Sequence, residues 1–269
     1  MPWTRHRVTA IPYTPRMAYR IMKAVFGPVL RLLFKVRVEG IEHVPAGGPL
    51  ILASNHLSFS DSIFLPLVLK RRVTFVAKAE YFEQRKTAWF FKMMGQIPIK
   101  RGGGAASQRA LESAKEVLDA DGVFGIYPEG TRSPDGRLYK GRTGVARLAL
   151  DCQAPVIAVA MLGTREAQPI GQVKPNFGSP ITIKFSRPLD FSRFETRRGD
   201  PLALRQITDE IMFELRELSG QDYVNSYAPK KGTDDVVGDP APAIVRSAPA
   251  SLSHSSSVLV GAGSMSASA

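Results

Sequence analysis

The chain has 269 residues, of which 44% are hydrophobic, and a formal net charge of +12. This length fits one large domain or two small ones with an ordinary core, and the single cysteine, Cys152, excludes an intramolecular disulfide and any CxxC site. The histidines at positions 6, 43, 56 and 254 lack ligand spacing, so we predict no bound metal, and the positive charge indicates nucleic acid, an anionic membrane surface or phosphorylated substrates as partners.

The N-terminal segment is basic and apolar. Residues 1–15 contain prolines and no hydrophobic period, so we predict an irregular arm. From Arg16 onward, basic side chains fall on one helical stripe and large apolar side chains occupy most of the rest. Up to Val38 the chain carries eight Lys or Arg residues and no acidic residue. These features predict a basic amphipathic helical segment within residues 1–38.

The charges in this segment indicate whether it would cross a membrane or lie on its surface. A transmembrane helix needs about 20 nearly uncharged residues, whereas Arg20, Lys23 and Arg31 interrupt this one. A signal peptide needs a clean apolar core and a small-residue cleavage site, and neither is evident. We predict a helix that lies in a membrane interface, with an ordinary core helix as the alternative. Because Pro28 lacks a backbone donor, Gly27-Pro28 is expected to break it into two short helices.

Short apolar runs alternate with helical periods through the middle of the chain. Five runs are predicted to be strands: Leu50–Ala53, Val73–Ala77, Val123–Tyr127, Pro155–Met161 and Ile181–Phe185. Five segments are predicted to be helices: Ser62–Leu69, Phe82–Met94, Ser107–Asp119, Thr143–Asp151 and Pro201–Leu218. This alternation predicts an α/β fold with a mostly parallel central sheet flanked by helices.

Capping residues mark several of these helix ends. Ser107 is placed to N-cap its helix, and Gly122 lies just past the end of that helix. Asp200 followed by Pro201 is typical of an N-cap with proline at the first helical position, and Gly220 is expected to stop that helix.

The composition changes after Tyr227. Residues 229–269 are rich in Ala, Ser, Gly and Pro and have almost no aromatic content. Such a segment cannot bury enough apolar area to offset its ordering entropy, so we predict a disordered tail. The predicted organisation is an arm and amphipathic segment at 1–38, an α/β domain at 39–228 and the tail at 229–269.

The stretch Asn55-His56-Leu57-Ser58-Phe59-Ser60-Asp61 lies between a predicted strand and a predicted helix. Loops at strand ends are where α/β folds place chemistry. His56 could take a proton near neutral pH while Asp61 holds its other ring nitrogen. From these two residues alone, a satisfied turn histidine beside a helix N-cap is the favoured alternative.

Two later stretches offer anion-binding groups. Tyr127-Pro128-Glu129-Gly130-Thr131-Arg132-Ser133 supplies backbone donors, a hydroxyl and a guanidinium that matches phosphate, and Lys140 and Arg142 follow it. The alternative for this stretch is a plain turn with an ion pair between Glu129 and Arg132. Lys100-Arg101 could clamp a phosphate, and the glycines at 102–104 could form a nest or merely a flexible connection. We find no P-loop, GxGxxG or GxSxG pattern.

Taken together, five segments resemble the glycerolipid acyltransferase family, the PlsC-like 1-acylglycerol-3-phosphate acyltransferases. Residues 55–61 resemble the NHxSxxD form of its HX4D motif, and residues 127–133 resemble its FPEGTRS block with tyrosine at the first position. Residues 97–101, 140–146 and 154–160 resemble its other blocks, in the family's order. Two departures concern the substrate: Ala158 replaces a usual proline, and Lys100 stands where an acidic residue is common.

The resemblance implies an enzyme that transfers an acyl group from acyl-CoA or acyl carrier protein to the free hydroxyl of lysophosphatidate, giving phosphatidate in phospholipid synthesis. His56 would be the general base and Asp61 its orienting partner. The implied substrate-binding set, in which Asn55 and Ser58 shape the catalytic turn, consists of Asn55, Ser58, Lys100, Arg101, Glu129, Gly130, Thr131 and Arg132.

The same resemblance implies the partners and the location. These are an acyl thioester donor as co-substrate, a phosphorylated lysolipid acceptor and an anionic membrane surface, with no cofactor, metal or nucleic acid. The enzyme would be peripheral or monotopic on the cytoplasmic face of the cell membrane. Lys140-Gly141-Arg142 belongs to the block that follows the Glu-Gly-Thr-Arg turn.

Two alternatives stay open. The motifs also fit acyl transfer to glycerol-3-phosphate, a lysophospholipid, a lyso-ornithine lipid or a glycolipid. A non-catalytic basic protein that binds membranes or nucleic acid on the same fold is the alternative from another class. The intact His56 and Asp61 pair counts against it, and no RNP, zinc-finger or helix-turn-helix pattern supports nucleic acid.

Overall fold

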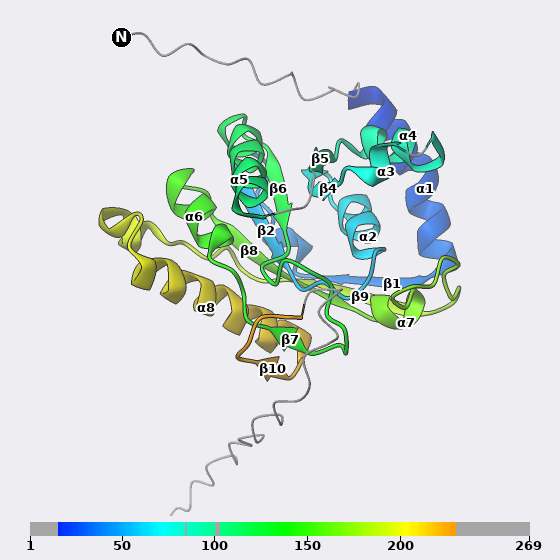
Figure 1. The fold of residues 1–269 in the computed structure, drawn as a ribbon. Coiled ribbons are helices and arrows are strands. Elements are labelled where there is room, and N and C mark those ends of the chain that lie inside the picture. The colour runs from blue at the N-terminus through cyan, green and yellow to red at the C-terminus, as the bar shows by residue number, and fades with distance from the viewer. Residues whose placement is uncertain (1–15, 84, 100–102, 230–269) are drawn as a thin grey trace, which may run out of the picture. The chain divides into compact units, whose positions relative to one another are not determined.

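The computed structural model describes residues 16–83, 85–99 and 103–229 (Figure 1). Its main sheet has six strands in the order β1-β9-β8-β2-β6-β3. These strands are β1 (Lys35–Glu39), β2 (Leu50–Ser54), β3 (Val73–Thr74), β6 (Val123–Ile126), β8 (Val156–Leu162) and β9 (Pro180–Phe185). Neighbouring strands pair in parallel except β8 with β9. The predicted α/β fold with a mostly parallel central sheet is confirmed.

Helices and two small sheets complete the described part of the chain. The helices are α1 (Arg16–Leu33), α2 (Asp61–Val68), α3 (Glu80–Glu83), α4 (Arg85–Met94), α5 (Gly103–Asp119), α6 (Gly144–Asp151), α7 (Thr164–Ala167) and α8 (Pro201–Ser219), with 3-10 turns η1 (Ile41–His43) and η2 (Ser192–Arg197). The small parallel sheets pair β4 (Val76–Lys78) with β5 (Ile97–Ile99) and β7 (Leu138–Tyr139) with β10 (Tyr223–Val224).

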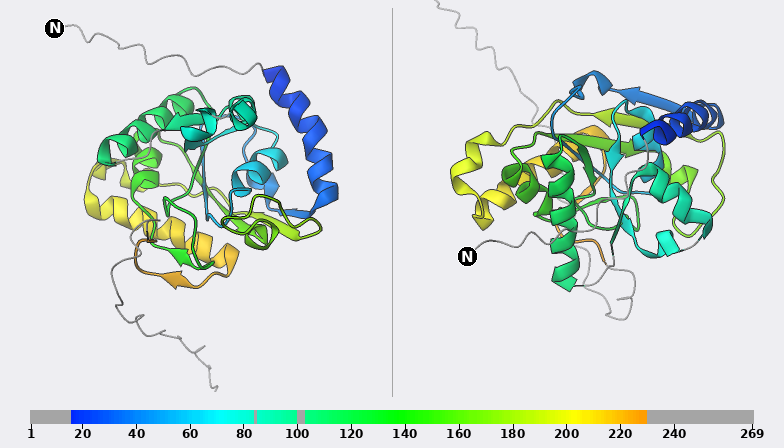
Figure 2. Two further views of the ribbon diagram at one scale, coloured as in Figure 1. Left: turned by 45° about the vertical axis from the view of Figure 1, so that its right-hand side comes forward. Right: turned by 90° about the horizontal axis from the view of Figure 1, so that it is seen from above.

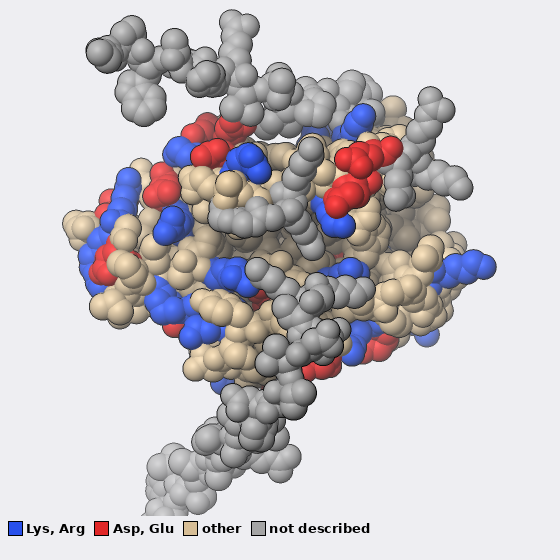
Figure 3. Space-filling model, in the orientation of Figure 1, with Lys and Arg blue, Asp and Glu red and all other residues tan. Residues whose placement is uncertain are grey.

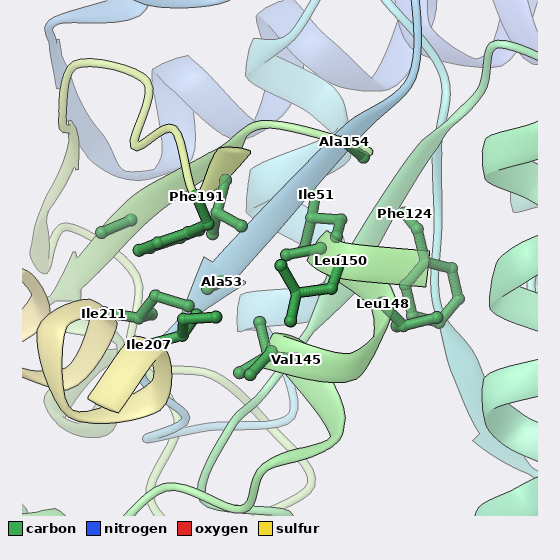
Figure 4. Packing of buried hydrophobic residues seen from close by; sticks show 14 of the residues in the cluster. Ile51, Ala53, Phe124, Val145, Leu148, Leu150, Ala154, Phe191, Ile207 and Ile211 are labelled. Carbon is green, nitrogen blue, oxygen red and sulfur yellow. The ribbon is translucent and has the colours of Figure 1, made fainter. Parts of the chain in front are cut away.

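The central strand β2 is buried along its whole length. Ile51 and Ala53 face a core that α5, α6 and α8 cover, and in Figure 4 Ile207 of α8 and Val145 of α6 lie around them. Leu50 and Leu52 face the opposite core, to which α2 contributes. A strand that is buried on both faces must be apolar at every position, which is why Leu50–Ala53 lacks polar alternation.

Helix α1 packs outside α2 and α4 (Figures 1 and 2). Tyr19 and Met22 form a buried cluster with Leu67 of α2 and Met94 of α4. The Tyr19 hydroxyl donates a hydrogen bond of 3.2 Å to the Pro66 carbonyl. None of the described helices combines the length and hydropathy needed to cross a membrane.

One prediction for the N-terminal segment is wrong. Helix α1 runs through Gly27-Pro28 without a break. Pro28 removes one backbone donor, but the residue before it is glycine, whose missing Cβ avoids the clash that disfavours a helix there. The helix ends at Leu33, and residues 35–39 form β1, in which Val36 and Val38 alternate with exposed residues and pair with β9.

The predicted strand Val73–Ala77 is divided. The buried Phe75 separates β3, which pairs with β6, from β4, which pairs with β5. The Phe75 amide donates to the Gln96 side-chain oxygen at 2.6 Å, and its carbonyl accepts from the Ile97 amide at 2.9 Å. Because these partners occupy the Phe75 backbone, the strand leaves β6 and turns toward β5.

Two predicted helix boundaries also differ. The helical segment predicted from Phe82 begins earlier, at Glu80 with α3, and α4 follows residue 84, which lies outside the described residues. The Thr87 hydroxyl near the start of α4 donates to the Tyr81 carbonyl at 2.7 Å. Helix α5 begins at Gly103, so Ser107 lies within the helix and does not N-cap it. The alanines at 105 and 106 favour helix and extend it upstream.

The capping predictions for α8 are confirmed. The Asp200 carboxylate accepts from the Leu202 amide at 2.9 Å, and Gly220 ends the helix in the left-handed region with φ of 68°. The Gly122 amide donates to the Val117 carbonyl at 2.9 Å just past the end of α5.

Several predictions fall outside the described residues. They concern the arm at 1–15, the disordered tail at 229–269 apart from Pro229, and the phosphate clamp at Lys100 and Arg101. The domain boundaries at 38 and 228 also stay predictions.

Candidate active site

The site lies where the parallel strands β2 and β6 end. The loop 55–60 follows β2 and leads into α2, and the loop that begins at Tyr127 follows β6. Because parallel neighbours end at the same edge of a sheet, the two loops meet. The Ser133 amide donates to the His56 carbonyl at 2.7 Å, and this bond ties the loops together.

Asp61 gathers three donors on one carboxylate oxygen. Its Oδ2 lies 2.9 Å from Nδ1 of His56 and accepts from the amides of Leu57 and Ser58, each at 2.8 Å. The Asp61 side chain is fully buried, whereas that of His56 is 14% exposed. Since a carboxylate only accepts, Nδ1 carries the ring proton and Nε2 keeps its lone pair. The hydrogen bonds of Asp61 run back to the loop, so it does not act as an N-cap of α2.

The imidazole of His56 is stacked on an aromatic ring. The centroids of the His56 and Tyr127 rings lie 3.8 Å apart with an interplanar angle of 11°. Phe75 stacks on Tyr127 at 5.2 Å and 17°. The Tyr127 hydroxyl lies 2.8 Å from the Ser62 hydroxyl. Burial, and then the negative charge of Asp61, raise the pKa of Tyr127 well above its ordinary value, so its hydroxyl stays neutral.

Glu129 supports the backbone of the loop 55–60. Its carboxylate accepts from the His56 amide at 3.2 Å and from the Tyr139 amide at 2.9 Å, and the residue is 1% exposed. Burial raises the pKa of Glu129 to about 7, and the two backbone donors oppose that rise. Because each carboxylate oxygen of Glu129 accepts a backbone hydrogen bond, the residue is held within the protein. The predicted alternative, an ion pair between Glu129 and Arg132, is not observed.

Gly130 is required by its conformation and its neighbour. Its φ is 76°, and a Cβ at this position would lie 3.0 Å from Nε of Arg142. Arg142 in turn stacks over the Tyr227 ring at 4.8 Å, and its amide donates to the Pro128 carbonyl at 2.8 Å. A side chain at 130 would displace Arg142 and strain the turn.

Arg132 is a predicted phosphate-binding cation that lies within the described residues. It is half-buried, and no residue of the described ranges makes a hydrogen bond or ion pair with its guanidinium. Thr131 beside it is also half-buried. An unengaged guanidinium at the edge of a polar loop can bind a phosphate in a bidentate manner.

Asn55 and Ser58 hold the loop from inside the protein, and both are fully buried. Asn55 accepts from the Met161 amide at 2.7 Å and donates to the Met161 carbonyl at 3.0 Å. The Ser58 hydroxyl donates to the Gln168 carbonyl at 2.7 Å. Because its proton is directed to that carbonyl, Ser58 is not paired with His56 as a nucleophile.

Comparison with known proteins agrees with this geometry. A family model described as acyltransferase matches residues 35–162, a range that contains the His56 and Asp61 pair and the Glu129 loop. The chain therefore resembles the acyltransferase family over these residues.

Curated relatives match part of the chain. The chloroplastic 1-acyl-sn-glycerol-3-phosphate acyltransferase LPAT1 of Arabidopsis thaliana is 30% identical over 161 residues, which cover 60% of this chain and 45% of the relative. The alpha enzyme of the same name from Homo sapiens is 32% identical over 136 residues, which cover 49% and 48%. The chain thus spans about half the length of the curated relatives it matches.

A solved structure matches more of the chain. The 1-acyl-sn-glycerophosphate acyltransferase PlsC from Thermotoga maritima aligns with a TM-score of 0.58 and 26% identity, covering 80% of this chain and 83% of that chain. The likeness therefore extends beyond the residues of the family model.

Two supporting residues of the candidate site come from contacts between segments distant in sequence. Gln221 accepts from Asn55 at 2.7 Å and donates to the Gly136 carbonyl at 2.6 Å, although it lies 166 residues from Asn55 in sequence. No spacing rule connects positions so far apart. For the stacking of Tyr127 the sequence offers one indication, which is the aromatic residue at the first position of the FPEGTRS block.

Proposed function

We propose that this protein transfers an acyl group from an acyl thioester, acyl-CoA or acyl carrier protein, to the free hydroxyl of lysophosphatidate and so makes phosphatidate. The observation that carries the proposal is the His56 and Asp61 pair, joined at 2.9 Å beside a loop whose Arg132 has no hydrogen-bond or ion-pair partner among the described residues. The names of the matched relatives, 1-acyl-sn-glycerol-3-phosphate acyltransferases, support the same acceptor.

The reaction follows from the ring nitrogen that Asp61 leaves free. Nε2 of His56 removes the proton of the acceptor hydroxyl, and the oxygen attacks the thioester carbonyl carbon. The C–S bond then breaks, and the leaving thiolate takes the proton back from the imidazolium. Asp61 stabilises the imidazolium without being protonated. General-base help contributes about 10²–10⁴-fold, and positioning of the two substrates contributes much of the rest.

Arg132 is proposed to hold the acceptor phosphate. We expect Arg132→Ala to raise the KM for lysophosphatidate about 10–100-fold, because a charge-assisted hydrogen bond contributes about 1.5–3 kcal/mol. The KM for the thioester and kcat should change far less. Steady-state kinetics with each substrate varied in turn measures this, with the exposed Arg147→Ala on α6 as a control for loss of one positive charge. A defect confined to the thioester would refute the assignment.

Helix α1 supports the proposed contact with an anionic membrane. Opposite its packed face, four apolar side chains are exposed at helical spacing: Ile21, Val25, Val29 and Leu32. Arg20 and Arg31 are exposed beside them. An exposed apolar stripe flanked by cations fits a membrane interface, where soluble thioester donors could approach from the cytoplasm. Figure 3 shows that basic and acidic side chains are interspersed on the face of the molecule that it draws.

The double variant Val25→Glu and Leu32→Glu should lower binding to anionic vesicles at least about tenfold, because burial of one large apolar side chain contributes about 1.5–3 kcal/mol. Vesicle sedimentation measures the bound fraction. The matched control changes two exposed apolar residues of another helix, Leu202→Glu and Phe213→Glu on α8. Equal losses in the two double variants would show that α1 is not the contact.

A panel of acceptors tests the proposed substrate. Thiol release from the thioester is followed with lysophosphatidate, glycerol-3-phosphate, a lysophospholipid, a lyso-ornithine lipid and a lysoglycolipid. We expect the highest kcat/KM with lysophosphatidate. A higher value for another acceptor would refute the acceptor but keep acyl transfer, whereas vesicle binding without thiol release from any mixture would favour the non-catalytic alternative.

A further inference from the structure

The His56 imidazole is held from two directions. Asp61 contacts the ring edge through Nδ1 at 2.9 Å, and Tyr127 covers one ring face at 3.8 Å between centroids. Tyr127 also stacks on Phe75, with ring centroids 5.2 Å apart and an interplanar angle of 17°. The hydrogen bond limits sliding of the imidazole in its plane, and the stack limits tilting out of it. Tyr127 is thus the middle ring of three that are nearly parallel.

The Tyr127 ring is itself fixed by its hydroxyl. That hydroxyl lies 2.8 Å from Oγ of Ser62, the residue that follows Asp61 in the first turn of α2. The contacts therefore form a closed circuit: Asp61 to His56, His56 to Tyr127, Tyr127 to Ser62, and Ser62 back to Asp61 along the chain. A shift of the tyrosine would have to break the Ser62 contact or move the start of α2.

We propose that Tyr127, anchored by Ser62, is a positioning residue that holds the His56 imidazole in place and stabilises it when it becomes an imidazolium. The inference rests on the proposed function of His56 as the general base. A cation that forms on an aromatic face in a partly dry site is stabilised by the ring quadrupole. The benefit arises mainly in the charged state, so it acts on kcat more than on substrate binding.

The hydroxyl distinguishes this chain from the FPEGTRS pattern. A phenylalanine would supply the stacking face but could not bond to Ser62. The neutral Tyr127 hydroxyl has no proton-transfer role in this proposal, because burial and the charge of Asp61 both disfavour its ionisation. Its contribution is to the orientation of the ring, and this contribution can be separated from the stack by substitution.

Three variants separate the two contributions. Tyr127→Leu removes the stack and should lower kcat about tenfold or more, with KM changed less than about twofold. Tyr127→Phe should restore most of this loss, and it and Ser62→Ala should each lower kcat only about threefold. If the two hydroxyls form one link, the double variant Tyr127→Phe with Ser62→Ala should be no slower than either single variant.

A spectroscopic readout reports the stack directly. In ¹³C-histidine-labelled protein, with the His56 signal assigned by its loss in His56→Ala, the ring current of Tyr127 shifts the His56 Hε1 resonance upfield. Tyr127→Leu should move this resonance downfield, and Tyr127→Phe should leave it near the wild-type position. The control Phe124→Leu removes a buried aromatic ring from β6, the strand that precedes Tyr127, but in the opposite core, and should lower stability without affecting the resonance or kcat.

The outcomes separate this inference from the proposed function. If His56→Ala is inactive while Tyr127→Leu keeps the wild-type kcat and resonance, Tyr127 has no positioning role. A loss for Tyr127→Leu that appears only in KM, or that equals the loss for Phe124→Leu, would also overturn the inference. Full activity in His56→Ala would instead refute the proposed base.

Discussion

Substitution of His56 by alanine is expected to lower kcat for acyl transfer about 10²–10⁴-fold, the usual contribution of a positioned general base. Nε2 of His56 is the nitrogen that the Asp61 hydrogen bond leaves with a lone pair. Binding of both substrates should persist, because the phosphate contact is assigned to Arg132. The measurement is steady-state thiol release with saturating acceptor and thioester.

The control for this variant is a second histidine. His43 in η1 contacts the Phe185 carbonyl through Nδ1 at 3.3 Å, and it takes no part in the site. His43→Ala should keep the wild-type kcat. A His56→Ala protein that is folded and retains near-native turnover would contradict the mechanism.

Asp61→Asn is expected to lower kcat about 10³–10⁴-fold with little change in KM, because an amide cannot stabilise the imidazolium as a carboxylate does. If the amide oxygen keeps the three donors now on Oδ2, its NH₂ group takes the Oδ1 position, which has no hydrogen-bond partner among the described residues. If the amide is reversed, NH₂ faces those donors. Both orientations leave a buried polar group unsatisfied, which costs about 1–3 kcal/mol of stability.

Thermal unfolding and kinetics together test this expectation. The variant should remain folded under assay conditions with a lower Tm, and its kcat should fall far more than the folded fraction does. Asp151→Asn, at an exposed position at the end of α6, is the control for loss of a negative charge. An Asp61→Asn enzyme with a kcat within tenfold of wild type would show that the carboxylate charge is not required.

The elements that sequence predicts well are those whose apolar pattern is unambiguous. Strand β2 is buried on both faces and therefore continuously apolar, and α8 carries matching caps at Asp200 and Gly220. By contrast, β7 and β10 have two residues each and exist because distant segments meet, as in the bond of 2.9 Å from the Leu138 amide to the Asp222 carbonyl. Local propensity carries no information about such a pairing.

The same distinction applies to the site. The contact between His56 and Asp61 is predictable because the two residues share one loop and one helix start. The role of Glu129 is not, because its bonds to the His56 and Tyr139 amides depend on how three separate segments meet. Sequence identifies Glu129 as a site residue but does not distinguish contact with substrate from support of the catalytic loop.

The most direct test of the central claim is to follow a labelled acyl chain from acyl-CoA into lipid. Purified wild-type and His56→Ala proteins are incubated with lysophosphatidate in anionic vesicles, and the lipids are analysed by mass spectrometry. The account predicts one labelled phosphatidate for each thiol released by the wild-type protein, and none above background for the variant. Thiol release without labelled phosphatidate, or equal phosphatidate formation by the two proteins, would contradict it.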